Sequence, residues 1–256
     1  MNGNLAEALK LSHRPVGIWF GSEEPRGYDP DAQPSSRCVL PYLLAASAGK
    51  SFCMREEDVK CPGGAVGLGF GDAFEKRHAS TRFLLSHGEE SEGYDPQVKL
   101  PPQMKRGERF FDCPDTVMRW KGSLGLEEAD YLYVCMTPLD DAAGRPYDRD
   151  PDLVFLLANP DQLSALVIMC GYRNGRPLNV VAPFCGACQS ILLAKQELAK
   201  EDPMAILGMF DLAQRHRVEK DLLSLTMVYG TYEALERDCD EGCLASHAWG
   251  QITERQ

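Results

Sequence analysis

The sequence predicts an α/β (or α+β) fold built from two tandem, pseudo-symmetric strand-helix-strand-helix-strand units that share a mixed sheet. Three observations predict it. The chain matches itself at a fixed offset, short apolar runs lead into the predicted helices, and a turn with cysteine and glycine occurs at the same place in each unit. Alternation of strand and helix patterns is typical of α/β proteins.

The self-match joins two segments with helical periodicity. The apolar positions of residues 39–46 fall on those of residues 163–170, and in both segments their spacing places the side chains on one helical face. Continued without a gap, the same offset lays Cys61 on Cys185. We therefore predict a first repeat over 1–145, with surface-loop insertions, and a second over 146–256, together in one compact fold.

Short apolar runs bounded by Pro, Gly, Asn and charged residues are typical of buried strands. Two of them precede the matching helices, and two others close the repeats, although the last of these can also be interpreted as the start of a helix. The four predicted strands are residues 15–20, 130–137, 152–158 and 221–228.

Local signals mark several helix ends. Asn159-Pro160 predicts the cap and first turn of a helix that runs through Cys170. The second helix of that repeat is clearest over residues 189–200. Another helix is predicted to begin after Cys113, whereas the polar segment 86–107 is expected to lie on the surface.

Composition excludes several classes of protein. No stretch approaches the roughly 20 consecutive apolar residues that a bilayer span needs, and the first ten residues lack the pattern of an export signal. The formal charge of −11 and the absence of a Lys/Arg stripe argue against a nucleic-acid partner. We expect a cytoplasmic protein that neither enters membranes nor binds nucleic acid.

Ten cysteines are the most informative feature of the composition. Disulfides are rare in a reducing compartment, which leaves free core thiols and metal ligation as interpretations. Cys53, Cys135 and Cys170 have apolar neighbours and are predicted to be core residues. The remaining cysteines are Cys38, Cys61, Cys113, Cys185, Cys188, Cys239 and Cys243.

The two repeated turns, residues 60–65 and 184–189, carry the candidate site. Their glycines, Gly63, Gly64 and Gly186, are expected to let the backbone approach a bound group closely. Helix N-terminal amides lower the pKa of a cysteine toward the thiolate, which is the form that binds metal or attacks. In the alternative interpretation, the small residues only allow tight helix–sheet packing.

Cys185 and Cys188 have the C-x-x-C spacing that directs two sulfur atoms to one metal ion, which is half of a four-ligand site. Packing of the repeats about a pseudo-two-fold axis would bring Cys61 near them as a third ligand. Cys38, Cys113, a histidine or an exogenous ligand remain candidates for the fourth.

The C-terminal tail carries Cys239, Cys243 and His247, which would share one face of a continuous helix. Gly242 and the acidic residues around it favour a helix end there, so a solvated terminus is expected rather than a second metal site. His78, His87 and His216 lie in charged stretches, and we expect exposed side chains rather than partners of a nucleophilic cysteine.

Over most of its length the chain resembles the domain-of-unknown-function 169 family, also called ArCR. The resemblance implies no particular reaction, because that family has no settled activity. The Cys-rich tail and Cys188 depart from its expected pattern. The matching features are Arg14-Pro-Val-Gly-Ile, Cys38, Cys61-Pro-Gly-Gly-Ala-Val-Gly-Leu-Gly69, Pro151-Asp-Leu-Val-Phe, Asn159-Pro-Asp-Gln-Leu163, the Cys185 turn and Asp221-Leu-Leu.

These residues favour a cysteine-ligated metalloprotein with a redox or accessory role and a redox partner protein. An iron–sulfur cluster is expected rather than zinc, because several cysteines and few histidine ligands are present. A non-metal protein that binds a small molecule between the repeats is one alternative. A thiol enzyme with Cys61 or Cys185 as nucleophile is the other.

Overall fold

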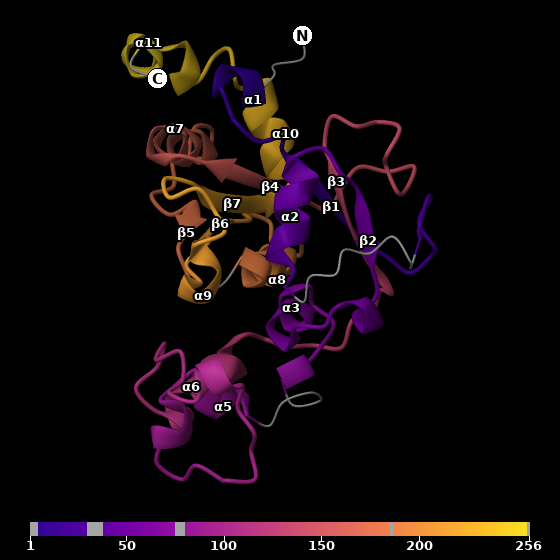
Figure 1. Ribbon diagram of the computed structural model, residues 1–256. Helices are drawn as coiled ribbons and strands as arrows, with labels where there is room; N and C mark the ends of the chain where they lie inside the picture. The colour runs from indigo at the N-terminus through magenta and orange to yellow at the C-terminus, as the bar shows by residue number, and fades with distance from the viewer. Residues whose placement is uncertain (1–4, 30–37, 75–79, 185–186, 255–256) are drawn as a thin grey trace. The chain divides into compact units, whose positions relative to one another are not determined.

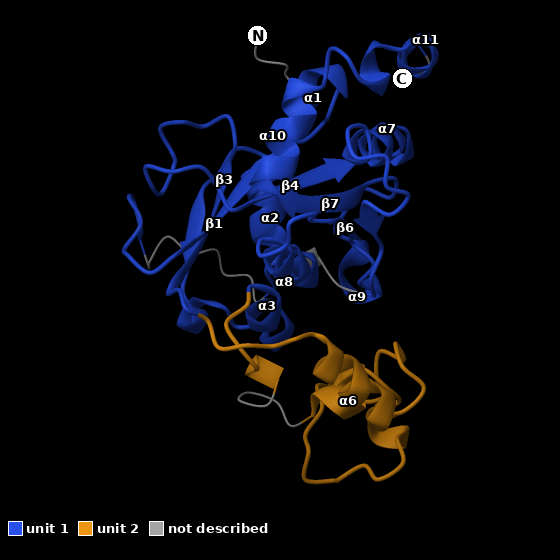
Figure 2. Ribbon diagram, turned by 180° about the vertical axis from the view of Figure 1, so that it is seen from behind, with its two compact units in different colours: residues 1–68, 130–256 blue, residues 69–129 orange. Residues whose placement is uncertain are grey.

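The computed structural model describes residues 5–29, 38–74, 80–184 and 187–254 (Figure 1). They form two compact units: unit 1 comprises residues 1–68 and 130–256, and unit 2 comprises residues 69–129 (Figure 2). None of the described helices has the length and apolar character needed to cross a membrane.

The described part of unit 1 contains one seven-stranded mixed sheet in the order β2-β3-β1-β4-β7-β6-β5. Neighbouring strands are antiparallel, except that β5 and β6 are parallel. The α/β class and all four predicted strands are confirmed, and the last of them is a strand rather than a helix. The strands are β1 (Val16–Gly21), β2 (Phe52–Met54), β3 (Tyr133–Pro138), β4 (Leu153–Ala158), β5 (Val180–Val181), β6 (Ala205–Gly208) and β7 (Leu223–Val228).

Strands from both predicted repeats belong to this one sheet. β1 and β4 pair antiparallel at its centre, with β3 and β2 outside β1, and β7, β6 and β5 outside β4. The boundary expected at residues 145 and 146 therefore falls within unit 1. The order is compatible with a duplication about the β1/β4 pair, and the duplication stays a prediction.

Helices cover both faces of the sheet. α7 (Pro160–Cys170) and α10 (Tyr229–Arg237) bury the face that carries Val154, Leu156 and Leu225. α2 (Leu40–Ser47) and α8 (Ala187–Glu197) lie on the other side of the sheet (Figure 1). Shorter elements complete the unit: α1 (Leu5–Ala8), α3 (Pro62–Gly67), α9 (Leu212–Arg215), α11 (His247–Thr253) and the 3-10 turns Glu56–Asp58 and Cys243–Ala245.

The start of α7 follows its sequence signal. Asn159 caps the helix by accepting a hydrogen bond from the Gln162 amide, and the Gln162 side chain accepts one from the Asn159 amide. The Gln162 side-chain amide also donates to the carbonyls of Leu9 and Lys10, both at 3.0 Å. This buried glutamine thus ties the N-terminal segment to α7.

Unit 2 has a small core of its own. Phe83 of α5 (Thr81–Leu84) and Val117 of α6 (Pro114–Ser123) are buried, and the rings of Phe74 and Phe111 pack against Trp120 of α6. α6 begins directly after Cys113, as predicted. The polar segment 86–107 belongs to this unit and includes the 3-10 turns Gly88–Glu90 and Pro102–Met104.

Cys53 and Cys135 lie in or against the core, as predicted, but they form a disulfide, so the expectation of free thiols is wrong. They face each other on β2 and β3, with Cα atoms 4.0 Å apart. The pairing depends on the register of two strands that are 82 residues apart in the chain. Cys170, predicted to be a core residue, is a free thiol that packs partly buried against the core, and burial raises its pKa to about 12.

Gln162→Ala should lower the free energy of unfolding by about 2 kcal/mol or more, because it leaves the Leu9 and Lys10 carbonyls and the Asn159 amide without their partner. Urea denaturation measures the change. Ser164→Ala, at an exposed position of the same helix, is the matched control and should shift stability by no more than about 0.5 kcal/mol. Equal effects of the two changes would contradict the role given to Gln162.

Candidate functional site

In unit 1 the first cysteine-and-glycine turn leads into α3, which packs directly against α8, the helix that begins in the second turn (Figures 1 and 2). Cys61 precedes α3, and Cys188 lies in the first turn of α8. A Cβ atom on Gly67 would lie 2.5 Å from the backbone carbonyl carbon of Cys188. Only glycine permits this approach of the two backbones.

Hydrogen bonds cross between the two turns. The Cys188 thiol donates to the carbonyl of Gly63 at 3.4 Å, and the side-chain amide of Gln189 donates to the same carbonyl at 3.1 Å. Gly63 thus contacts α8 through its backbone oxygen. Gly64 has a packing role, because a Cβ there would lie 2.8 Å from a methyl group of Val39.

Cys38 and Cys188 line one small cavity, which has room for about one water molecule. The segment that follows β6 closes it. The remaining lining residues are Leu40, Met209, Asp211, Gln214, Arg215 and Val218.

Burial raises the pKa of the Cys188 thiol well above its ordinary value, and the nearby thiols of Cys61 and Cys38 raise it further. Burial likewise raises the pKa of Cys38, with a contribution from Cys61. The expectation that helix N-terminal amides lower the pKa of the turn cysteines is therefore wrong for Cys188. Loss of solvent outweighs the helix dipole, and both sulfur atoms are protonated thiols at neutral pH.

The segment after β6 bears local strain and an unpaired polar atom. Met209 is a non-glycine residue with a φ of 74°, in the left-handed region that side chains disfavour. The Gln214 side-chain oxygen is buried and has no hydrogen-bond partner within the described part of the chain. Burial raises the pKa of Asp211, whose carboxylate accepts a hydrogen bond from the Ala213 amide.

Two of the predicted site residues, Cys185 and Gly186, lie outside the described residues. Cys113 belongs to unit 2, where its thiol lies 3.3 Å from the Thr116 hydroxyl. The structure therefore brings together Cys38, Cys61 and Cys188 of the predicted set. In the described ranges, no group of three or more His, Cys, Asp or Glu side chains is arranged to hold a metal ion as it stands.

The C-terminal tail is packed, and the expectation of a solvated terminus is wrong. Cys239 is buried, its pKa is raised to about 11 by that burial, and the Cys243 thiol donates to the Ala165 carbonyl of α7. α10 ends at Arg237, so the two cysteines do not share the face of one helix. His247 begins α11 and is exposed.

Asp211 and Gln214 are site residues that the sequence patterns do not reveal. Asp211 caps a helix of only four residues, which is a weak local signal. Nothing in the spacing connects this segment to Cys38 or Cys188, because only the tertiary packing brings them to one cavity.

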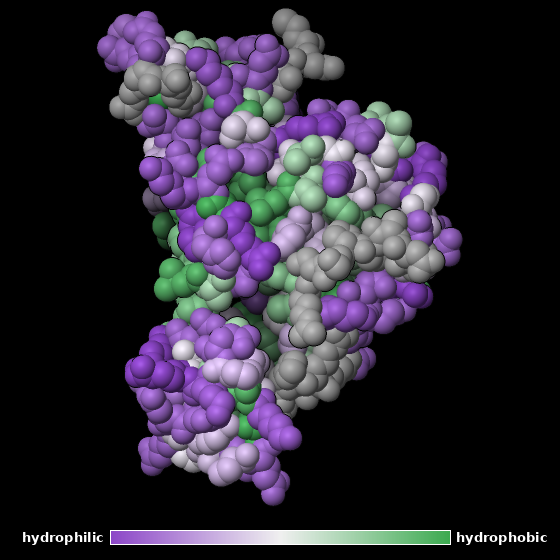
Figure 3. Space-filling model, in the orientation of Figure 1, coloured by the Kyte–Doolittle hydropathy of each residue, from purple (hydrophilic) through white to green (hydrophobic). Residues whose placement is uncertain are grey.

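Apolar side chains lie at the surface close to these segments. Phe184 is the first residue of the second turn, Leu212 begins α9, and their exposed fractions are 42% and 73%. Figure 3 shows hydrophobic surface on unit 1 in the region where Figure 1 draws β5 and α9. The cysteine cavity is thus flanked by apolar surface.

Unit 1 also has two larger grooves, of about 640 and 880 Å³. The first runs between α7 and α10, and the second runs between α1 and α10. Neither is lined by the described glycines Gly63 and Gly64, so neither matches the ligand site expected beside those turns.

Comparison with known proteins yields one match. A family model, DUF169, with the description Uncharacterised ArCR, matches residues 4–238. No curated protein and no solved structure matches the chain.

Gly67→Ala should separate α3 from α8 and lower the free energy of unfolding by about 1–3 kcal/mol, because the new methyl group meets backbone atoms of Cys188. The Cys188 thiol should also react faster with a maleimide in the folded variant. Gly230→Ala of α10 is the control, because a Cβ there meets nothing within 4 Å. Unchanged stability and thiol reactivity in Gly67→Ala would show that the helices do not pack this closely.

Proposed function

Because the chain belongs to the DUF169 family of uncharacterised ArCR proteins, whose description names no reaction, we propose a function from the chain's own geometry. The protein is a cysteine-ligated metal-binding protein that holds an iron–sulfur cluster in a redox or accessory role. The observation that carries the proposal is the close packing of α3 and α8, which gathers the thiols of Cys61 and Cys188 beside Cys38.

The donor set favours iron–sulfur chemistry. Iron–sulfur clusters take cysteine thiolates as ligands, commonly four of them. Cys38, Cys61 and Cys188 supply three, and Cys185, in C-x-x-C spacing with Cys188, is the proposed fourth. The described lining of the cavity contains no histidine, which makes a mixed Cys/His zinc site the less favoured alternative.

Protonated thiols with raised pKa values fit ligands better than a nucleophile. A thiol enzyme needs a thiolate at rest, which requires a lowered pKa, whereas the pKa values of Cys38 and Cys188 are raised. A metal displaces the thiol protons when it binds, so a raised pKa in the metal-free site does not oppose coordination. This contrast supports Cys38 and Cys188 as metal ligands rather than nucleophiles.

We place the protein in the cytoplasm and propose a redox partner protein for it. The exposed side chains of Phe184 and Leu212 beside the cysteine segments suit an apolar contact with such a partner. A partner bound to this apolar surface would lie close to the proposed cluster, and a short distance between redox centres favours electron transfer.

Protein purified without oxygen should be brown and should contain iron and acid-labile sulfide. Visible absorption and chemical analysis measure both. A colourless protein that contains zinc would support the zinc site instead of the iron–sulfur cluster. A metal-free protein after anaerobic purification would contradict the proposal altogether.

Cys38→Ser, Cys61→Ser and Cys188→Ser should each lower the affinity for the metal by roughly 10-fold or more, since loss of a ligand is at least as harmful as loss of a group that orients one. Cys170→Ser is the matched control, because Cys170 lies on α7, on the opposite face of the sheet from α8, and its metal content should equal that of the unmodified chain. Circular dichroism verifies that each variant is folded. Full metal content in all three variants would show that the site lies elsewhere.

A further inference from the structure

The disulfide between Cys53 and Cys135 lies on a different face of the sheet from the candidate metal site. Cys135 faces Trp19 of β1, in a cluster with Tyr133. The alternation of side chains along β1 and β4 places Trp19 on the same face as Val154, which α7 and α10 cover. α8 packs on the other face, where its Ser190 hydroxyl contacts that of Thr226.

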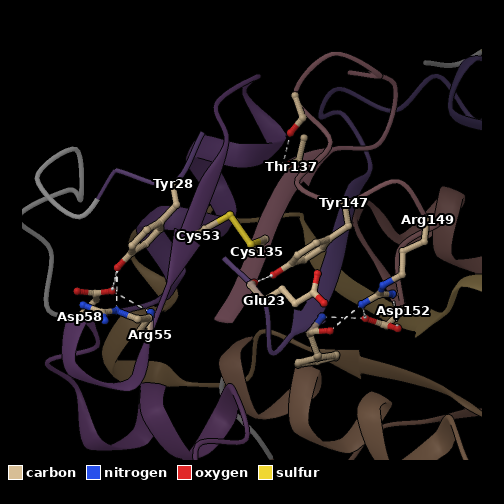
Figure 4. Close-up of a disulfide and its surroundings, with 12 residues drawn as sticks. Glu23, Tyr28, Cys53, Arg55, Asp58, Cys135, Thr137, Tyr147, Arg149 and Asp152 are labelled. Atoms are coloured by element: carbon tan, nitrogen blue, oxygen red, sulfur yellow. Dashed lines mark hydrogen bonds and ion pairs between the residues drawn. A yellow bond between two sulfur atoms is a disulfide. The ribbon is translucent and has the colours of Figure 1, made fainter. Parts of the chain in front are cut away.

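The two cysteines of the disulfide differ in their exposure to a reagent. Cys135 is fully buried, whereas Cys53 is partly exposed on β2, which is the last strand at its edge of the described sheet. In Figure 4, Tyr28 lies beside Cys53 and Tyr147 lies beside Cys135. An attacking thiolate would therefore reach Cys53.

The disulfide holds a short strand. β2 pairs with β3 at only three positions, and Cys53–Cys135 is the middle one. Such a short edge strand has few hydrogen bonds of its own to keep it in place. The disulfide therefore provides much of the attachment of β2 to β3.

β2 leads directly into the segment that carries Cys61. A tight turn follows at Arg55, whose amide donates to the Asp58 carboxylate at 2.8 Å. The Tyr28 hydroxyl joins this turn, because it donates to Asp58 at 3.2 Å and accepts from the Arg55 guanidinium at 3.0 Å (Figure 4). Cys61 and α3 come next in the chain.

We propose that Cys53–Cys135 is a thiol–disulfide exchange site whose reduction by a cellular dithiol releases β2 and loosens the segment that carries Cys61. The inference takes the cytoplasmic location from the proposed function, because disulfides in a reducing compartment are usually transient, catalytic or redox-sensing. It does not require a bound metal.

The exchange balances with the dithiol as reductant. One thiolate of the donor attacks Cys53, a bond forms between the two sulfur atoms, and the Cys53–Cys135 bond breaks. The electron pair goes to Cys135, which takes up a proton. The second thiol of the donor then displaces Cys53 as a free thiol, which leaves a reduced pair in the protein and a disulfide in the donor.

The test uses the full chain, first oxidised and then treated with dithiothreitol under native conditions. Reduction should speed amide hydrogen exchange over residues 52–61 by roughly 10-fold or more, while the amides of β4 and β7 keep their rates. Reoxidation with oxidised glutathione should restore slow exchange. In a parallel sample, reduced glutathione should form its mixed disulfide on Cys53 rather than on Cys135, as mass spectrometry can show.

The double variant Cys53→Ser/Cys135→Ser should exchange like the reduced chain, with or without dithiothreitol. Cys170→Ser is the matched control and should respond as the unmodified chain does. Three results would each overturn the proposal: a disulfide reduced only after unfolding, glutathione on Cys135, or unchanged exchange over 52–61. Because none of these readouts involves metal, they are independent of the iron and sulfide analysis.

Discussion

The contact between Gly67 and the backbone of Cys188 sets the distance between the two cysteine-bearing segments, and the geometry of the site depends on it. A side chain at position 67 would push α3 away from α8. With glycine there, the carbonyl of Gly63 reaches both the thiol of Cys188 and the amide of Gln189. The Cys188 thiol held in this contact is a thiol rather than a thiolate, because burial raises its pKa.

The sheet separates the disulfide from the candidate metal site. Trp19 and Cys135 lie on one face, and α8 with Cys188 lies on the other. The disulfide and the candidate metal site are close along the chain, because β2 leads through the turn at Arg55 to Cys61. A change at the disulfide can therefore reach the cysteine cavity through the backbone, although the sheet prevents direct contact of the sulfur atoms.

The features that the sequence predicts depend on residues close together in the chain, whereas those it misses depend on contacts between distant segments. The start of α7 follows from Asn159 and Gln162, which are neighbours in the chain, and the strands follow from local apolar runs. The Cys53–Cys135 pair depends on a strand register between distant segments, and no local pattern encodes it.

The candidate site shows the same limit. The repeated turns identify Cys61 and Cys188 from the sequence. Asp211 and Gln214 line the cavity only because tertiary packing brings their segment there. The pKa of Cys188 is the clearest case: its position at a helix start predicts a lowered value, whereas burial raises it. Packing between elements thus decides the chemistry of a residue that local signals identify.

Tight helix packing alone accounts for only part of the site. It explains why Gly64 and Gly67 have no side chain, since each would meet a neighbouring element. It gives no reason for the left-handed backbone of Met209 or for the buried oxygen of Gln214 that lacks a partner in the described structure. Both features carry a free-energy cost of about 1–3 kcal/mol each, and such costs cluster where function requires them. Both border the cavity of Cys38 and Cys188, which is consistent with the proposed binding role of that cavity.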